Sequence, residues 1–218
     1  MYQPPNIIPI FPLGTVLFPQ MILPLQIFED RYKQLLRDCL EGNSRFGVAL
    51  IKEGAEVGDP AVPCDIGTVA RIRRVVPLED GRFEVLVLGE RRFRIREMTQ
   101  WKPYEKALVS YPVDVEGDPP MRLWEVEDIR DKTTAYLRTV LGLQGGWSAR
   151  VDSPTDPVEL SYYIASVTRG DAKERQAILE ALSGRQRLAM LLPTLEAESK
   201  ANAEQIRERF LLKGVRLN

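Results

Sequence analysis

A row of arginines is one of two side-chain groups in this sequence whose types and spacing suit ligand binding. The segment "RRFRIR" (Arg91–Arg96) alternates basic and apolar residues, so a β-strand would carry alternate arginines on one face. Arginines arranged in this way neutralise the phosphates of nucleic acids, although such alternation also fits a solvated face paired with acidic neighbours. The residues of a candidate RNA-binding stripe are Arg71, Arg73, Arg92, Arg94 and Arg96.

The second group is apolar and lies in "PIFPLGTVLFPQMILPLQIFEDRYKQLL", which begins at Pro9. The part between Leu13 and Leu25 has little polar cover, and we interpret it as a loop. Exposed apolar patches mark partner surfaces, but large apolar side chains are also typical of a core. Outward-facing polar residues early in the following helix would bind an extended peptide. The candidate polypeptide-binding residues are Val16, Phe18, Met21, Ile22, Phe28, Arg31 and Gln34.

The amino-acid composition gives little support for a catalytic function. The chain has no histidine, which excludes Ser-His and Cys-His nucleophile pairs, histidine general bases and histidine-based zinc sites. Its two cysteines, Cys39 and Cys64, are far apart and have no metal-ligand spacing. No glycine-rich phosphate-binding motif occurs. We therefore expect no catalytic residues, no metal site and no cofactor, with Cys39 as an inert core residue.

The charge balance and the distribution of apolar residues favour a soluble protein. The net charge of -1 gives no attraction to nucleic acid or to an anionic membrane. No run approaches the roughly 18 apolar residues of a membrane helix, and the start of the chain lacks the features of a signal peptide. The few cysteines fit a reducing compartment. We expect a cytoplasmic protein without membrane contact.

The first half of the chain must position both groups, and it is predicted as short β-strands with one helix. "NIIPIFPL" is typical of an edge strand because of its prolines, and "EDGR" predicts a hairpin turn. "RFEVLVLGE" and "RRFRIREM" are predicted as two strands that meet at Gly89–Glu90. The helix "FEDRYKQLLRDCLEG" and the residue before it predict one apolar face, which comprises Ile27, Tyr32, Leu35, Leu36, Cys39 and Leu40. These elements predict a curved sheet or barrel over residues 1–118.

The second half, residues 119–218, is predicted as a helical bundle that begins after "EGDPP". Three helix-start signals follow one another, at Asp156, Asp171 and Ser183, each with Glu or Gln three residues later. The last helix has a polar middle and regains apolar residues towards its end. That end either folds back on its own domain or contacts another molecule, which would allow self-association. Its apolar residues are Ile206, Phe210, Leu211 and Leu212.

The ordered set of motifs resembles the N-terminal domain of Lon-type ATP-dependent proteases. The set comprises "IPIFPLGTVLFPQMILPLQIFEDRY", "FGVALI", "GTVARI" and "DGRFEVLVLGERRFRI", followed by the helical bundle. The resemblance covers about Ile7 to Leu212. It is closest to stand-alone bacterial proteins built from that domain alone.

This resemblance implies an α+β fold: a PUA-like β pseudo-barrel with one helix, followed by a C-terminal α-helical bundle. It implies a non-catalytic module that recognises unfolded or partly unfolded polypeptides, or a partner protein, in protein quality control. Because neither the Lon ATPase nor its Ser-Lys protease has a counterpart before Asn218, we expect no enzyme activity. PUA-like folds also bind RNA, so the arginine stripe remains the alternative, although the charge balance disfavours a nucleic-acid partner.

Overall fold

The computed structural model describes residues 6–59, 61–115, 119–146 and 152–215 and divides into two compact units. Unit 1 consists of Met1–Val113 together with Asp171–Glu180, and unit 2 consists of Asp114–Gly170 and Ala181–Asn218. The chain therefore passes between the units three times. The predicted boundary at 118/119 lies next to residues outside the described part. That the chain folds as two domains divided there stays a prediction.

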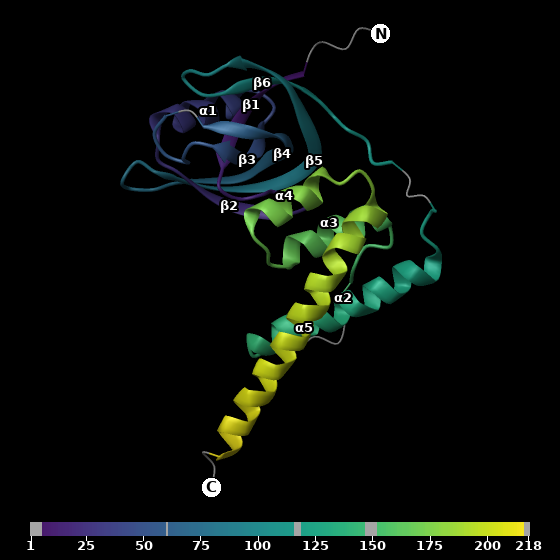
Figure 1. Cartoon of the computed structure of the whole chain (residues 1–218). Helices are drawn as coiled ribbons and strands as arrows, with labels where there is room; N and C mark the ends of the chain where they lie inside the picture. Colours follow the sequence, from purple (N-terminus) through teal and green to yellow (C-terminus); the bar gives the residue numbers. More distant parts are fainter. Residues whose placement is uncertain (1–5, 60, 116–118, 147–151, 216–218) are drawn as a thin grey trace. The chain divides into compact units, whose positions relative to one another are not determined.

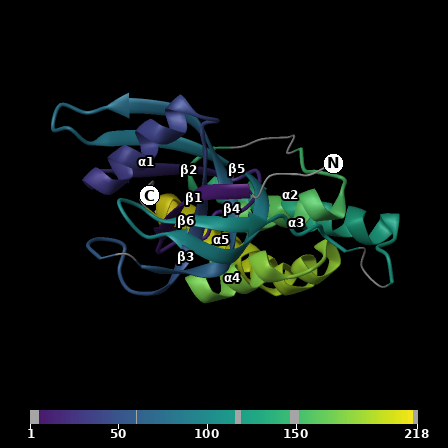
Figure 2. The ribbon, with the colours of Figure 1, turned by 90° about the horizontal axis from the view of Figure 1, so that it is seen from above.

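Unit 1 is a curled six-stranded mixed sheet with two helices (Figure 1 and Figure 2). The strands run in the order β2-β5-β4-β3-β1-β6, and β5 also pairs with β6. This last pairing closes five strands into a ring, and β2 is added to the side of β5. The elements are β1 (Asn6–Leu13), β2 (Ile22–Ile27), α1 (Asp30–Glu41), β3 (Arg45–Glu53), β4 (Val62–Pro77), β5 (Phe83–Gln100), β6 (Lys106–Ser110) and α4 (Ala172–Glu180).

The prediction that β1 is an edge strand is wrong, because β1 lies between β3 and β6. Its first half, up to Pro9, pairs antiparallel with β6, and its second half, from Ile10, pairs parallel with β3. Each half of β1 therefore has one partner strand and one side that forms no ladder. Proline, which has no N–H to donate to a ladder bond, is tolerated where its nitrogen faces that side. The segment interpreted as a loop also contains a strand, β2, in which Pro24 pairs with Leu86.

The predicted break at Gly89–Glu90 is also absent, since β5 runs without interruption through both residues. Gly89 serves close packing instead of a turn. A Cβ atom at this position would lie 2.1 Å from the carbonyl oxygen of Phe18. The lack of a side chain lets the segment before β2 lie directly on β5.

The core of unit 1 fills the inside of the curled sheet. Helix α1 adds four residues of the buried face expected from the sequence, Tyr32, Leu35, Leu36 and Cys39, whereas Leu40 was predicted on this face and is 47% exposed. Its amide at Gly42 closes the helix by bonding to the carbonyls of the last turn. The side chains of α1 join a cluster of strand residues that includes Phe11, Phe46, Val48, Val85 and Val87.

Unit 2 contains three helices: α2 (Leu123–Leu143), α3 (Pro157–Val167) and α5 (Gly184–Val215). The buried Arg187 of α5 links this helix to α3 by donating to Ser161 Oγ at 2.8 Å, and it also pairs with Asp114. Helix α5 follows α2 to its end, where the Arg209 guanidinium donates to the Leu143 carbonyl at 2.6 Å. The side chains of Phe210, Leu211 and Leu212 lie outside the described part, so self-association through them stays a prediction.

The three helix starts predicted from capping signals are present. The backbone amides of Glu159, Glu174 and Gln186 donate to the side chains of Asp156, Asp171 and Ser183, respectively, at 2.9, 2.8 and 3.1 Å. One of these helices, α4, belongs to unit 1, whereas the sequence pattern placed it in the bundle. In the described part of the chain, no helix is both long and apolar enough to cross a lipid bilayer.

Candidate polypeptide-binding surface

The apolar segment that precedes β2 is largely buried. Val16, Leu17 and Phe18 are each at most 1% exposed, so they form core and not an open surface. The Thr68 hydroxyl donates to the Leu17 carbonyl at 2.6 Å, which fixes this segment to β4. The sequence hypothesis needs Val16 and Phe18 to face a ligand, and in this structure they do not.

Helix α4 covers the same segment. The Arg175 guanidinium lies 4.8 Å from the centre of the Phe18 ring, and one of its nitrogens lies 3.8 Å from the Met21 sulfur. Burial lowers the pKa of the Arg175 side chain. The sequence did not reveal this contact, because α4 lies about 150 residues further along the chain.

A different apolar surface of unit 1 is open, and we call it the outer face. Alternate residues of β2, β5 and β4 point away from the core, and the pairing register aligns them in three rows across the strands. Ile22 is 60% exposed, and the Leu86 and Leu88 side chains are partly exposed. The rows are Ile22–Leu88–Arg71, Pro24–Leu86–Arg74 and Gln26–Glu84–Val76.

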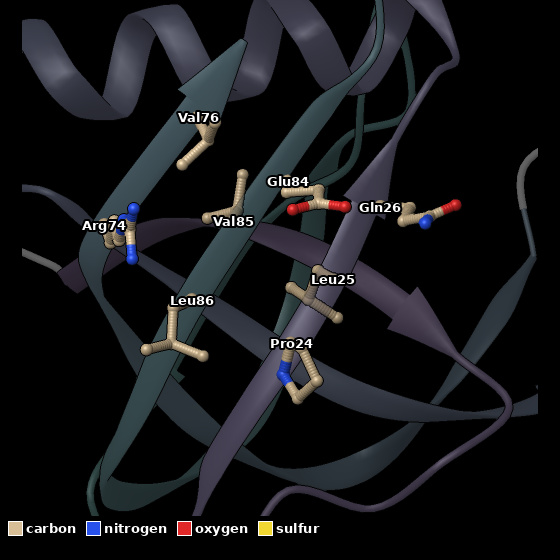
Figure 3. Close-up of a pocket in the computed structure, with 8 residues that line it drawn as sticks. All are labelled: Pro24, Leu25, Gln26, Arg74, Val76, Glu84, Val85 and Leu86. Carbon is tan, nitrogen blue, oxygen red and sulfur yellow. The ribbon is translucent and has the colours of Figure 1, made fainter. Parts of the chain in front are cut away.

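The outer face includes a groove of 530 Å³, shown in Figure 3. Its apolar lining comes from Pro24, Leu25, Val76, Val85 and Leu86. Arg74 lies on the β4 side of the groove and Gln26 on the β2 side. The side chains of Arg74 and Glu84 form no hydrogen bond or ion pair with any residue that the structure describes. Apolar contact area and two unpaired charges of opposite sign are therefore available to a ligand.

The open edge of β2 is less suitable for binding than its face. In an antiparallel ladder, residues that bond to the neighbouring strand alternate with residues that face away. The Met21 carbonyl accepts a hydrogen bond from the Gly89 amide at 2.9 Å, so the backbone of Met21 faces β5. Pro24 lies three positions later, and by this alternation its backbone nitrogen faces the open edge. Proline has no N–H, and it interrupts any regular pairing of a further strand with this edge.

The remaining candidates, Phe28 before α1 and Arg31 and Gln34 on α1, differ in accessibility. Phe28 is 47% exposed and available for contact. Arg31 is mostly buried and pairs with Glu29 at 3.1 Å and Glu105 at 3.5 Å. Gln34 donates to Asp38 at 2.6 Å. Arg31 and Gln34 therefore satisfy contacts within unit 1, and Ile22 is the predicted residue that is most exposed.

The arginine stripe does not form one continuous surface. Arg92 is 5% exposed and donates to the Leu179 carbonyl at 2.8 Å, so it is not available to a phosphate. Arg71 lies 3.9 Å from Glu90, which also pairs with Arg45, and Arg96 donates to Ser110. Arg73 is exposed, and Arg94 is partly exposed.

The two cysteine thiols and the acidic side chains are the groups that could act as nucleophiles or metal ligands. Burial raises the pKa of the Cys39 thiol to about 12, and burial also raises that of Cys64, so both thiols stay protonated at neutral pH. Among the residues that the structure describes, no three Cys, Asp or Glu side chains lie together in a way that would hold a metal ion.

Residues 7–197 match the family model of the ATP-dependent protease La (LON) substrate-binding domain. The chain belongs to this family. Lon protease 2 from Myxococcus xanthus is 31% identical over 198 residues, which is 88% of this chain and 24% of that protein. Lon protease from Syntrophus aciditrophicus is 28% identical, over 86% of this chain and 25% of that protein. The chain thus spans about a quarter of the length of these curated relatives.

Two solved structures show the same fold. A Lon N-terminal domain protein from Xanthomonas campestris matches with a TM-score of 0.65 and 27% identity, over 86% of this chain and 98% of that one. The N-terminal domain of a Mycobacterium avium complex Lon protease matches with a TM-score of 0.64 and 20% identity, over 88% and 98% of the respective chains. The α+β fold implied by the resemblance, a PUA-like pseudo-barrel with a helical bundle, is confirmed.

Proposed function

We propose that this LON substrate-binding domain is a non-catalytic module that captures unfolded or partly unfolded polypeptides on its outer face. In the cytoplasm it would act in protein quality control beside an ATP-dependent protease. Family membership supports substrate recognition, and the family model that matches is that of the binding domain. The observation that carries the choice of surface is the exposed apolar row that contains Ile22 and Leu88.

The chemistry of the outer face suits unfolded clients. Contact with an apolar client side chain removes the remaining exposed area of Ile22, Leu86 and Leu88 from water. A fully buried aliphatic side chain contributes about 1.5–3 kcal/mol before ordering costs. Arg74 and Glu84 add attraction to charges of either sign at the groove. Such a surface favours apolar client segments and does not require that they share one amino-acid sequence.

The test measures affinity for a permanently unfolded, fluorescently labelled polypeptide at low and high salt. Replacing Ile22 by Ser should weaken binding by about tenfold, or about 1.4 kcal/mol, and salt should change the affinity little. Ile7→Ser is the matched control, because Ile7 is 51% exposed in the same unit but lies on β1 in a hollow beside Tyr104 and Lys106. Ile7→Ser should bind as the wild type does.

Two outcomes would contradict this proposal. Equal affinities of the Ile22→Ser and wild-type chains would remove the outer face as the binding surface. Capture of a structured RNA with steep salt dependence, together with no capture of polypeptide, would favour the arginine-based alternative instead. Arg73→Glu would then be the next variant, since Arg73 is an exposed arginine of that stripe.

A further inference from the structure

Helix α4 reaches unit 1 as an isolated segment. The residues on both sides of Asp171–Glu180 belong to unit 2, so only these ten residues enter unit 1 from the second half of the chain. Asp171 caps the helix, which is nine residues long. Helices shorter than about 12–15 residues are marginal by themselves in water. The helical form of α4 therefore depends on its contacts with the barrel.

Contacts with the barrel come in particular from three positions of α4, which are Arg175, Gln176 and Leu179. The Gln176 amide donates to the Ile66 carbonyl of β4 at 3.0 Å. The Leu179 side chain is 1% exposed, and its carbonyl, at the last turn of the helix, accepts from Arg92 at 2.8 Å. Arg175 lies against the Phe18 ring. The surface beneath α4 thus recognises a helix with Arg, Gln and Leu spaced as Arg-Gln-x-x-Leu.

The fit of α4 is incomplete at Gln176. Its Oε1 atom is buried and accepts no hydrogen bond from the residues that the structure describes. A buried acceptor without a donor lowers stability relative to a fully bonded side chain. Leu179 is the one apolar side chain of α4 that is fully buried. Another helix that presents the same three residues would meet the same contacts, although α4 keeps the advantage of high effective concentration because it is attached to the chain at both ends.

We propose that the surface beneath α4 is a helix-binding site, which the chain fills with its own α4 and which a client polypeptide can occupy instead. The client is a short amphipathic segment that forms a helix and carries the Arg-Gln-x-x-Leu pattern. When α4 leaves, Phe18, Met21 and the Ile66 carbonyl become accessible. The proposal rests on the proposed function in one respect, that the occupant is a polypeptide. The site is separate from the outer face.

A labelled peptide with the sequence of residues 170–182, "GDAKERQAILEAL", tests this site by fluorescence anisotropy with the full chain. Leu179→Ala in the chain weakens the docking of its own α4 and leaves the site open more often. The apparent affinity for the peptide rises in proportion to the open fraction, so we expect binding about tenfold tighter than to the wild type. Lys173→Ala is the matched control, because Lys173 is an exposed residue of α4.

Specificity is tested with a second peptide in which Leu179 is replaced by Ala, which should bind at least about tenfold more weakly. If the Leu179→Ala chain fails to fold by circular dichroism, Gln176→Glu serves in its place, because it sets a carboxylate against the Ile66 carbonyl and Glu180. Equal peptide affinity for the wild-type and opened chains would overturn the proposal. So would equal binding of the two peptides.

The Ile22→Ser chain separates this proposal from the previous one. Ile22 lies on the outer face, where it pairs with Leu88 of β5. With α4 opened by Leu179→Ala, addition of Ile22→Ser should leave peptide affinity unchanged while it weakens capture of the unfolded polypeptide. Loss of peptide binding together with loss of polypeptide capture would show that α4 does not cover a site separate from the outer face.

Discussion

Unit 1 has two apolar surfaces that are adjacent in sequence and opposite in accessibility. The segment Val16–Phe18 is at most 1% exposed, whereas Ile22, four residues later, is 60% exposed. The first is covered by α4 and packed on Gly89. The second lies on a sheet face that no described element of unit 1 covers. A similar composition thus serves as core in one place and as candidate binding surface in the other.

The difference shows that accessibility here is decided by distant residues. Arg175 and Met21 are 154 positions apart in the chain. The outer face, by contrast, follows from local strand alternation and from the register of β2 against β5. Variants that act on one surface should therefore leave the other unchanged, and this expectation makes the comparison testable.

The largest effect is expected at the position where the covered segment lies on β5. Gly89→Ala introduces a Cβ atom 2.1 Å from the Phe18 carbonyl oxygen, and neither backbone can yield without shifting a strand. We expect a loss of more than about 4 kcal/mol in the free energy of unfolding, measured by urea denaturation.

Gly14→Ala is its control, because the nearest atom to a Cβ there is the flexible Glu56 carboxylate at 3.1 Å. Its expected effect is about 1 kcal/mol or less. A Gly89→Ala chain as stable as the Gly14→Ala chain would show that the covered segment is not held against β5.

A matched pair of substitutions compares the two surfaces directly. Phe18→Ser removes a fully buried ring and should cost about 4 kcal/mol of stability, as large-to-small core changes do. Ile22→Ser should cost about 1 kcal/mol or less, because most of the side chain already contacts water. Equal losses of stability in the two variants would mean that the outer face is covered in solution, and the assignment of the binding surface would then fail.

Local signals in the sequence were sufficient to predict where three helices begin and which face of α1 is buried. The caps at Asp156, Asp171 and Ser183 and the buried face of α1 depend on residues within one or two turns of each other. They were predicted because no distant contact competes with them. The ordered motifs of the first half likewise identified the family and, through it, the fold.

Prolines and glycines were harder to interpret, because their roles depend on partner strands. Pro24 suggested a loop, yet it lies in an edge strand whose open side needs no N–H donor. Gly89 suggested a boundary between two strands, yet it permits a close approach of Phe18 within one strand. Both roles require knowledge of which strand lies alongside, and the sequence pattern of one segment does not contain this.

The binding surface proposed from the structure overlaps only in part with the residues suggested by the sequence. The sequence identified an apolar segment that includes Ile22, and the structure retains Ile22, Phe28 and part of Met21 as accessible. It missed Leu86 and Leu88, whose alternation with buried Val85 and Val87 was a usable signal in β5. It also had no means of placing α4 on unit 1.

Two glutamates, one on the outer face and one in the interior of unit 1, allow the same comparison with a smaller expected effect on stability. On the outer face, Glu84 is exposed to water, whereas Glu105 is fully buried next to Arg31. The Glu105 Oε2 atom accepts no hydrogen bond from the residues that the structure describes. Burial raises the pKa of the Glu105 carboxyl above its ordinary 4.5, and the nearby Arg31 guanidinium opposes this shift without cancelling it.

A raised pKa in the folded state means that protonated Glu105 favours folding. Its contribution to stability is complete below about pH 4.5, the ordinary carboxyl value, and is lost as the pH rises through the folded-state pKa. Glu105→Gln removes this loss and keeps an acceptor for Arg31. The variant should therefore gain stability over the wild type as the pH rises from 4 to 7, by less than the loss expected for Phe18→Ser.

Urea denaturation at several pH values measures this difference, with Glu84→Gln as the exposed control, which should follow the wild type at every pH. The reverse trend, a Glu105→Gln chain that loses stability relative to the wild type as the pH rises, would mean that attraction between ionised Glu105 and Arg31 exceeds the cost of burial. The 3.5 Å separation of the two groups and the orphaned Oε2 atom argue against that balance. A buried carboxylate with one long contact gains too little from its partner to offset the loss of water.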